Sequence, residues 1–267
     1  MAYPLTASSL DTSALRAEPL EALYALIESH VKEKRYPGCQ IALAHNGQLV
    51  LDKSFGMARI GQGHAADTVA VPARSDSLWL LYSNTKVIVA TALWKLHEQG
   101  HLRFTDKVTE YLPEFGRHSK DAITLFQVIT HQGGFPDRDV PSSVWHDHAQ
   151  VRQAVCDFSL QWPPGSRIQY HGLSAHWVLA MVIEAVTGQD FRAYITDTIL
   201  RPLGLENDLF VGLPEAQQSR MTYLYEPAAT ELQQQLREES TSTTWQRAGV
   251  PGGGAYGTAR GLSLIHI

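Results

Sequence analysis

The stretch LWLLYSNTKVIVATALWKLHEQG, residues 78–100, organises the rest of the chain. Its apolar residues between positions 87 and 96 point in nearly every direction around a helix. This spacing predicts a helix that is buried on most sides. Ser83 suits the N-cap position at the start of this helix, and Gly100 is expected to end it.

Lys86 is an unusual residue for the first turn of a helix. The positive end of the helix dipole favours Asp or Glu there, and a capping box would place Glu or Gln at this position. A serine hydroxyl becomes a good nucleophile only when another group takes its proton, and the amine of a buried lysine can do this. Ser83 and Lys86, one turn apart, therefore indicate a nucleophile and its base. The competing interpretation is a capping serine beside a lysine that reaches solvent.

The composition is typical of a globular protein. The chain has 267 residues, of which 44% are hydrophobic and 18% charged, and its net charge is −5. This charge predicts no nucleic-acid partner, and no apolar run is long enough to predict a membrane span. Residues 1–20 lack the pattern of a secretory signal, so we expect a cytoplasmic protein. Two cysteines, Cys39 and Cys156, cannot form a disulfide framework and are expected to be buried free thiols.

The remaining elements alternate between short helices, strands and turns. Residues 19–36 predict an amphipathic helix, and Asn46-Gly47 predicts a hairpin between two strands. Residues 61–74 have the composition of a loop, and the polar segment QQQLREESTSTT (233–244) that of a surface insertion. Further helices are expected over residues 123–130, in the second part of 141–160, over 174–187 and 191–200, and after Thr258 as a cap.

The order of these signals resembles the serine beta-lactamase and penicillin-binding-protein superfamily, specifically its class C beta-lactamase-like group, which includes the family VIII carboxylesterases. After the S-x-x-K helix, the matching segments run in family order: YLPEF (111–115), ITLFQVITHQGGFPD (123–137), PPGSRIQY (163–170), IEAVTG (183–188), RPLGLEN (201–207) and GGGAYGTA (252–259). The resemblance implies an α+β fold, an antiparallel sheet flanked by helices. The domain would cover residues 19–267, with a helical region at about 100–245, after an N-terminal tail at 1–18.

The same resemblance implies a three-residue catalytic site. Ser83 would be the acylated nucleophile, Lys86 its base, and Tyr170 the tyrosine of a Y-x-N motif that passes a proton to the leaving group. The oxyanion hole would combine the backbone N–H of Ser83 with one from a strand near the C-terminus. No cofactor and no metal are implied, the partner would be a small-molecule ester or amide, and the oligomeric state stays open.

The chain departs from the family pattern in two places. The Y-x-N triplet here is Tyr170-His171-Gly172, which lacks the asparagine that beta-lactamases use. The family's third motif, K-T-G or H-x-G, would lie beyond residue 267, so the C-terminal strands are expected to be missing. We therefore expect a carboxylesterase. A beta-lactamase, a D-amino peptidase or an acyltransferase is the alternative within the superfamily, and a truncated, catalytically silent protein is the alternative outside enzymes.

Three further motifs favour structural roles. Residues 97–101, HEQGH, match a zinc-binding H-E-x-x-H, but Gly100 is expected to end the helix before the second histidine. His146-Asp147-His148 is more typical of a solvated loop than of a metal site, and Gly252–Gly254 of a turn. A second S-x-x-K match, Ser29 to Lys32, lies among charged residues on a helix and indicates a solvated face.

Overall fold

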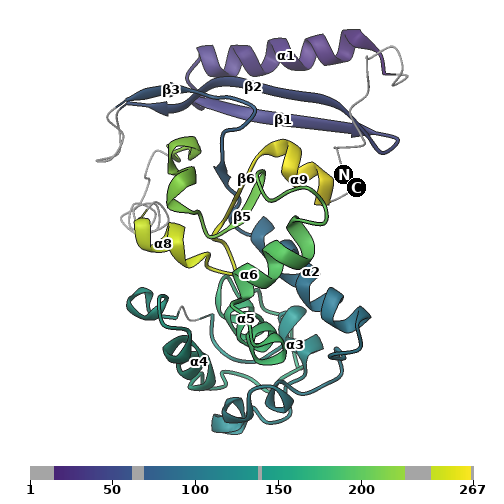
Figure 1. Cartoon of the computed structure of the whole chain (residues 1–267), viewed down its shortest axis with the longest axis vertical. Helices are drawn as coiled ribbons and strands as arrows, with labels where there is room; N and C mark the ends of the chain where they lie inside the picture. The colour runs from purple at the N-terminus through teal and green to yellow at the C-terminus, as the bar shows by residue number, and fades with distance from the viewer. Residues whose placement is uncertain (1–14, 62–68, 138–139, 226–241, 266–267) are drawn as a thin grey trace.

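The computed structural model describes residues 15–61, 69–137, 140–225 and 242–265. Most of the expected N-terminal tail and most of the segment 233–244 lie outside these residues. The described chain forms a helix over a first sheet, a second small sheet beside a C-terminal helix, and a helical region at the opposite end (Figure 1). The expected combination of antiparallel sheets and helices is therefore present, although the strands form two sheets rather than one.

The first sheet contains the predicted hairpin. Strands β1 (Gly38–His45) and β2 (Gln48–Ile60) are antiparallel, and α1 (Ala17–Lys32) lies across them (Figure 1). Asn46 and Gly47 both have positive φ, 51° and 73°, as a two-residue hairpin turn requires. A third strand, β3 (Ala70–Pro72), pairs with β2. Of the expected loop over 61–74, residues 62–68 lie outside the described part of the chain. Over residues 70–72 the expectation was wrong, because a strand of three residues is too short to show alternation.

The second sheet joins three segments that are far apart in the sequence. Its strand order is β4 (Trp79–Leu80), β6 (Ala255–Gly257), β5 (Leu209–Val211), and both pairs are antiparallel. The central strand β6 follows the glycine-rich turn at 251–254, and β4 leads towards Ser83. This pairing holds the glycine-rich turn beside the start of the 78–100 helix.

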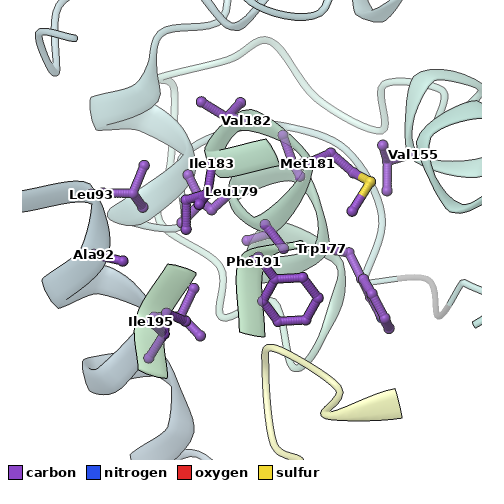
Figure 2. Packing of buried hydrophobic residues seen from close by; sticks show 14 of the residues in the cluster. Ala92, Leu93, Val155, Trp177, Leu179, Met181, Val182, Ile183, Phe191 and Ile195 are labelled. Carbon is purple, nitrogen blue, oxygen red and sulfur yellow. The ribbon is translucent and has the colours of Figure 1, made fainter. Parts of the chain in front are cut away.

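The helical region is built around α5 (Ser174–Thr187). Residues 174–183 of α5 are all buried, and α2 (Asn84–Glu98), α3 (Leu125–Ile129), α4 (His148–Cys156) and α6 (Phe191–Ile195) pack around it. Gly188 ends α5 in the left-handed conformation, as predicted. After α6 the chain continues as a π-helical turn, Thr196–Leu200. Figure 2 shows the resulting core, in which Trp177, Leu179, Met181, Val182 and Ile183 of α5 lie among Ala92, Leu93, Val155, Phe191 and Ile195.

Helix α2 largely matches its prediction. It ends at Glu98, and Gly100 follows with φ at 76°, the left-handed conformation expected of a helix stop. Most of its apolar residues are buried, but Val87 and Trp94 are 48% and 57% exposed. The expectation of burial on most sides therefore holds except along this one line of residues.

The C-terminal part of the described chain contains two short helices. Helix α8 (Thr243–Ala248) buries Trp245, so the polar composition around it concealed an element that packs on the core. Helix α9 (Ala259–Ile265) is capped as expected, because Oγ1 of Thr258 accepts a hydrogen bond of 2.9 Å from the Gly261 N–H. No described helix combines the length and apolar character that crossing a bilayer requires. The 3₁₀ helices are Val108–Glu110, Pro113–Ser119, Ser142–Val144 and Glu215–Arg220.

Both cysteines are free, as expected. Cys156 is buried, whereas Cys39 is only half-buried.

Candidate active site

The turn before α2 sets the position of Ser83. Tyr82 has a φ of 44°, an uncommon left-handed conformation for a large side chain, and Ser83 follows at the N-cap position. The hydroxyl of Ser83 makes no capping hydrogen bond, so the interpretation of Ser83 as a capping side chain was wrong. Strained conformations of this kind cluster at functional sites, and here the Ser83 hydroxyl contacts Tyr170 instead of capping the helix.

The structure brings Ser83, Lys86 and Tyr170 together. Oγ of Ser83 lies 2.6 Å from the hydroxyl oxygen of Tyr170, and Nζ of Lys86 lies 3.2 Å from Oγ of Ser83. Ser83 and Lys86 share one turn of α2, whereas Tyr170 comes from the segment just before α5. Because α2 and α5 pack against each other, residues 87 positions apart in the sequence meet at one point.

Lys86 is held by two backbone carbonyls in addition to Ser83. It is only 8% exposed, and its Nζ donates to the carbonyl oxygens of Gly172, at 2.5 Å, and Gly252, at 2.7 Å. A Cβ atom at position 252 would lie 2.7 Å from the Gly172 oxygen, so only glycine allows the two loops to approach this closely. Residues 252–254 follow the turn that the sequence predicts, but nothing in their composition indicates the contact with Lys86.

Tyr170 is half-exposed and close to the lysine. Nζ of Lys86 lies 4.9 Å from the centre of its ring, and the ring of His131 packs on it at 4.8 Å. Partial burial raises the pKa of the Tyr170 phenol, but hydrogen bonding to Lys86 and Ser83 lowers it by more, so the pKa lies below its usual value. The environment therefore favours the phenolate more than water does.

Three histidines lie behind the site, and the sequence analysis assigned them no role there. The rings of His131 and His171 stack at 5.8 Å, and that of His176 lies 6.2 Å from His131. Burial lowers the pKa of all three, that of His176 to about 3, and the positive charge of Lys86 adds to this effect on His131 and His176. All three imidazoles are therefore neutral at pH 7.

A carboxylate lies at the exposed side of the site. Oδ1 of Asp137 accepts a hydrogen bond of 3.3 Å from the Leu173 N–H, at the start of α5. A Cβ atom on Gly172 would lie 3.0 Å from Oδ2 of Asp137. The pKa values of Tyr170 and His131 are lowered overall, but the negative charge of Asp137 makes a small opposite contribution to both, so its electrostatic field reaches the site.

The metal-like motifs do not join this site. His101 of the H-E-x-x-H match lies outside α2, and Nδ1 of His97 lies 3.0 Å from the carbonyl oxygen of Leu102. His148 does not lie in a solvated loop as expected: it is the first residue of α4 and bonds Glu184 at 2.6 Å.

Among the described residues, one group of possible metal ligands lies close together. His148, Glu184 and Asp190 place their donor atoms within 4.8 Å of one another. These groups already have protein partners, because Glu184 accepts from the Phe191 N–H and Asp190 pairs with Arg192. Their arrangement is explained by the packing of α4, α5 and α6.

The geometry agrees with the comparison to known families. The model of the Beta-lactamase family matches residues 23–264, and the chain belongs to this family of serine hydrolases. The resemblance inferred from the ordered motifs is therefore confirmed.

Relatives and solved structures give a consistent picture. A protein of Escherichia coli K12 named "Putative D-alanyl-D-alanine carboxypeptidase" is 29% identical over 91% of this chain, and the chain spans only 59% of that relative. A protein of the same name from Salmonella agona is 26% identical over 78% of the chain and 51% of the relative. A family VIII carboxylesterase structure has a TM-score of 0.79 at 24% identity, covering 95% of this chain and 70% of its own. A penicillin-binding protein homologue from Caulobacter crescentus has a TM-score of 0.78 at 24% identity, covering 94% and 69%. At this identity the two structures show the shared fold.

Proposed function

We propose that this chain is a serine hydrolase that cleaves carboxylic esters through an acyl-enzyme on Ser83. The observation that carries this proposal is the placement of the Ser83 hydroxyl between the Lys86 amine and the Tyr170 phenol, at 3.2 and 2.6 Å. A nucleophile within hydrogen-bond reach of a base and of a proton donor is the arrangement that acyl transfer requires.

The partners of Lys86 fit the role of a base. A neutral amine has two N–H groups and one lone pair. The carbonyls of Gly172 and Gly252 can accept the two N–H groups, which leaves the lone pair directed at the hydroxyl of Ser83. The two carbonyls thus orient the amine for proton transfer.

The proposed reaction balances its protons within these three residues. Lys86 takes the proton of Ser83 while Oγ bonds to the ester carbonyl carbon. When the bond to the leaving alcohol breaks, Tyr170 protonates the alcohol oxygen and recovers a proton from the Lys86 ammonium. Water then hydrolyses the acyl-enzyme by the same route. Within the described residues, the backbone N–H of Ser83 donates no hydrogen bond, which supports its use for the developing oxyanion.

The preference for esters rests on the residue after His171. Gly172 has no side chain, so the triplet offers no amide to hold a carbonyl of a peptide or beta-lactam. The names of the curated relatives favour a second candidate, a peptidase for D-alanyl-D-alanine ends, which would use the same three residues.

A fluorophosphonate probe tests the proposal. We expect covalent labelling that peptide mass mapping assigns to Ser83 and that Ser83→Ala abolishes. p-Nitrophenyl butyrate, nitrocefin and a D-alanyl-D-alanine peptide then separate esterase, lactamase and peptidase. Folded protein that takes no label would favour the catalytically silent alternative and contradict the proposal.

A further inference from the structure

Asp137 lies beside the reactive groups without having a part in the proposed proton transfers. It follows the HQGG turn, and its side chain is exposed, as is that of Tyr170. One carboxylate oxygen, Oδ1, is fixed by the N–H of Leu173. Among the residues that the structure describes, no group donates a hydrogen bond to the other oxygen, Oδ2, and the exposed side chain leaves it accessible to a bound molecule.

The position of Asp137 depends on Gly172. A side chain at position 172 would begin 3.5 Å from Oδ1 of Asp137, an ordinary contact, but 3.0 Å from Oδ2, so the carboxylate would have to shift by a few tenths of an ångström. The carboxylate therefore occupies space that a larger residue at 172 would take. The carbonyl of the same Gly172 accepts a hydrogen bond from Lys86, so Asp137 and Lys86 both lie close to this one residue.

No nearby histidine offsets this negative charge at pH 7. His131, His171 and His176 all have lowered pKa values and are neutral there. The amine of Lys86, which contacts Ser83, is only 8% exposed and donates to the carbonyls of Gly172 and Gly252. A substrate entering at the exposed side of Tyr170 therefore meets the negative charge of Asp137.

We propose that Asp137 determines specificity by favouring substrates with an ammonium or another hydrogen-bond donor close to the scissile carbonyl, such as aminoacyl esters, and by disfavouring substrates with a carboxylate there. This inference rests on the proposed esterase function. Two opposite charges about 6 Å apart attract by enough to change a rate between about threefold, at the dielectric constant of water, and about a hundredfold, at an effective dielectric constant of about 20, and two like charges repel by a similar amount.

Three p-nitrophenyl esters with acyl chains of similar size provide the test. The β-alanyl ester carries an ammonium, the butyryl ester a methyl group in the same place, and the succinyl ester a carboxylate. We expect kcat/KM to fall in the order β-alanyl, butyryl, succinyl. In Asp137→Asn, which keeps the shape and removes the charge, the ratio of β-alanyl to succinyl should fall about tenfold or more. Raising the salt concentration should reduce the ratio in the unmodified protein only.

Asp197→Asn is the matched control. It removes an exposed carboxylate that pairs with Arg201 at 2.6 Å, and it should leave the ratio unchanged. An equal ratio in the unmodified protein and Asp137→Asn, or a preference for the succinyl ester, would overturn the inference.

A failure of the inference about Asp137 can be distinguished from a failure of the proposed function. If no ester is hydrolysed but fluorophosphonate still labels Ser83, β-alanine methyl ester and monomethyl succinate can be compared as competitors of the probe. The ratio of the concentrations at which they protect Ser83 then replaces the ratio of kcat/KM values. If Ser83 takes no label at all, the proposed function fails and the role of Asp137 fails with it.

Discussion

Two buried lysines in this protein have similar polar contacts, but only one of them contacts a group that can donate a proton. Nζ of Lys120 is fully buried and donates to the carbonyls of Arg117, Cys156 and Phe158. Nζ of Lys86 donates to two carbonyls, and its third neighbour is the Ser83 hydroxyl. The two environments therefore differ in one partner, which is a hydroxyl at Lys86 and a carbonyl at Lys120.

The difference between the two environments explains why we propose Lys86, and not Lys120, as a base. Burial lowers the pKa of Lys120 to about 8, yet its three neighbours are acceptors that have no proton to give. Lys120 therefore ties the 3₁₀ helix Pro113–Ser119 to the end of α4 and to Phe158. At Lys86 the hydroxyl of Ser83 can donate to the amine, and Tyr170 can receive the proton afterwards.

The largest predicted effect is the loss of hydrolysis on removing Ser83 or Lys86. Ser83→Ala and Lys86→Met should each lower kcat/KM for p-nitrophenyl butyrate by about 10³-fold or more, because neither leaves a serine with a base. Steady-state rates on protein shown to be folded by circular dichroism measure this. If kcat/KM fell less than about tenfold in Lys86→Met, Lys86 would have a structural role like that of Lys120, and its assignment as the base would be contradicted.

Removing the phenol hydroxyl should have the next largest effect. Tyr170→Phe keeps the ring against His131 and removes the hydroxyl that we propose as the proton donor to the leaving alcohol, so kcat should fall about 10²- to 10³-fold. Esters with better leaving groups should be affected less, because they need less protonation. An equal loss across a series of phenyl esters would assign Tyr170 a structural role instead.

Lys120→Met should lower stability and leave catalysis unchanged, whereas Lys86→Met should lower catalysis. Three carbonyls would lose their donor, so the free energy of unfolding should fall by about 2–4 kcal/mol. Urea denaturation measures this change, and kcat of the remaining folded protein should be unchanged. A large loss of kcat with unchanged stability would contradict the structural role.

The last prediction concerns the pH dependence of stability rather than catalysis. His176 has a folded pKa of about 3, below its ordinary value of 6.5, so the unfolded chain binds the proton more tightly. Stability is therefore complete above pH 6.5 and is lost as the pH falls towards 3. In His176→Gln the slope of unfolding free energy against pH in this window should decrease by up to about 1.4 kcal/mol per pH unit.

The elements that the sequence predicted are those specified by local residues. The turn at Asn46-Gly47, the helix stops at Gly100 and Gly188 and the cap at Thr258 each depend on a few neighbouring residues. The strands β3, β4, β5 and β6 have two or three residues each and depend on partners from distant segments, so no periodicity could reveal them.

The candidate site divides in the same way. Ser83 and Lys86 are one turn apart, and Tyr170 was found through the resemblance of the motif order. The carbonyls of Gly172 and Gly252 belong to backbone that any sequence carries, so their role at Lys86 depends on the packing of two loops. Lys120 follows a charged, polar segment that is typical of a surface, and its burial arises from α4 closing over it.

The rate of fluorophosphonate labelling in three proteins tests the central claim most directly. Peptide mass mapping would follow Ser83 in the unmodified chain, in Lys86→Met and in Lys120→Met. The account predicts that Ser83 is labelled in the unmodified protein and in folded Lys120→Met at similar rates, and at least about 100-fold more slowly in Lys86→Met. Labelling of Ser83 at the same rate in all three proteins would contradict the assignment of Lys86 as the base.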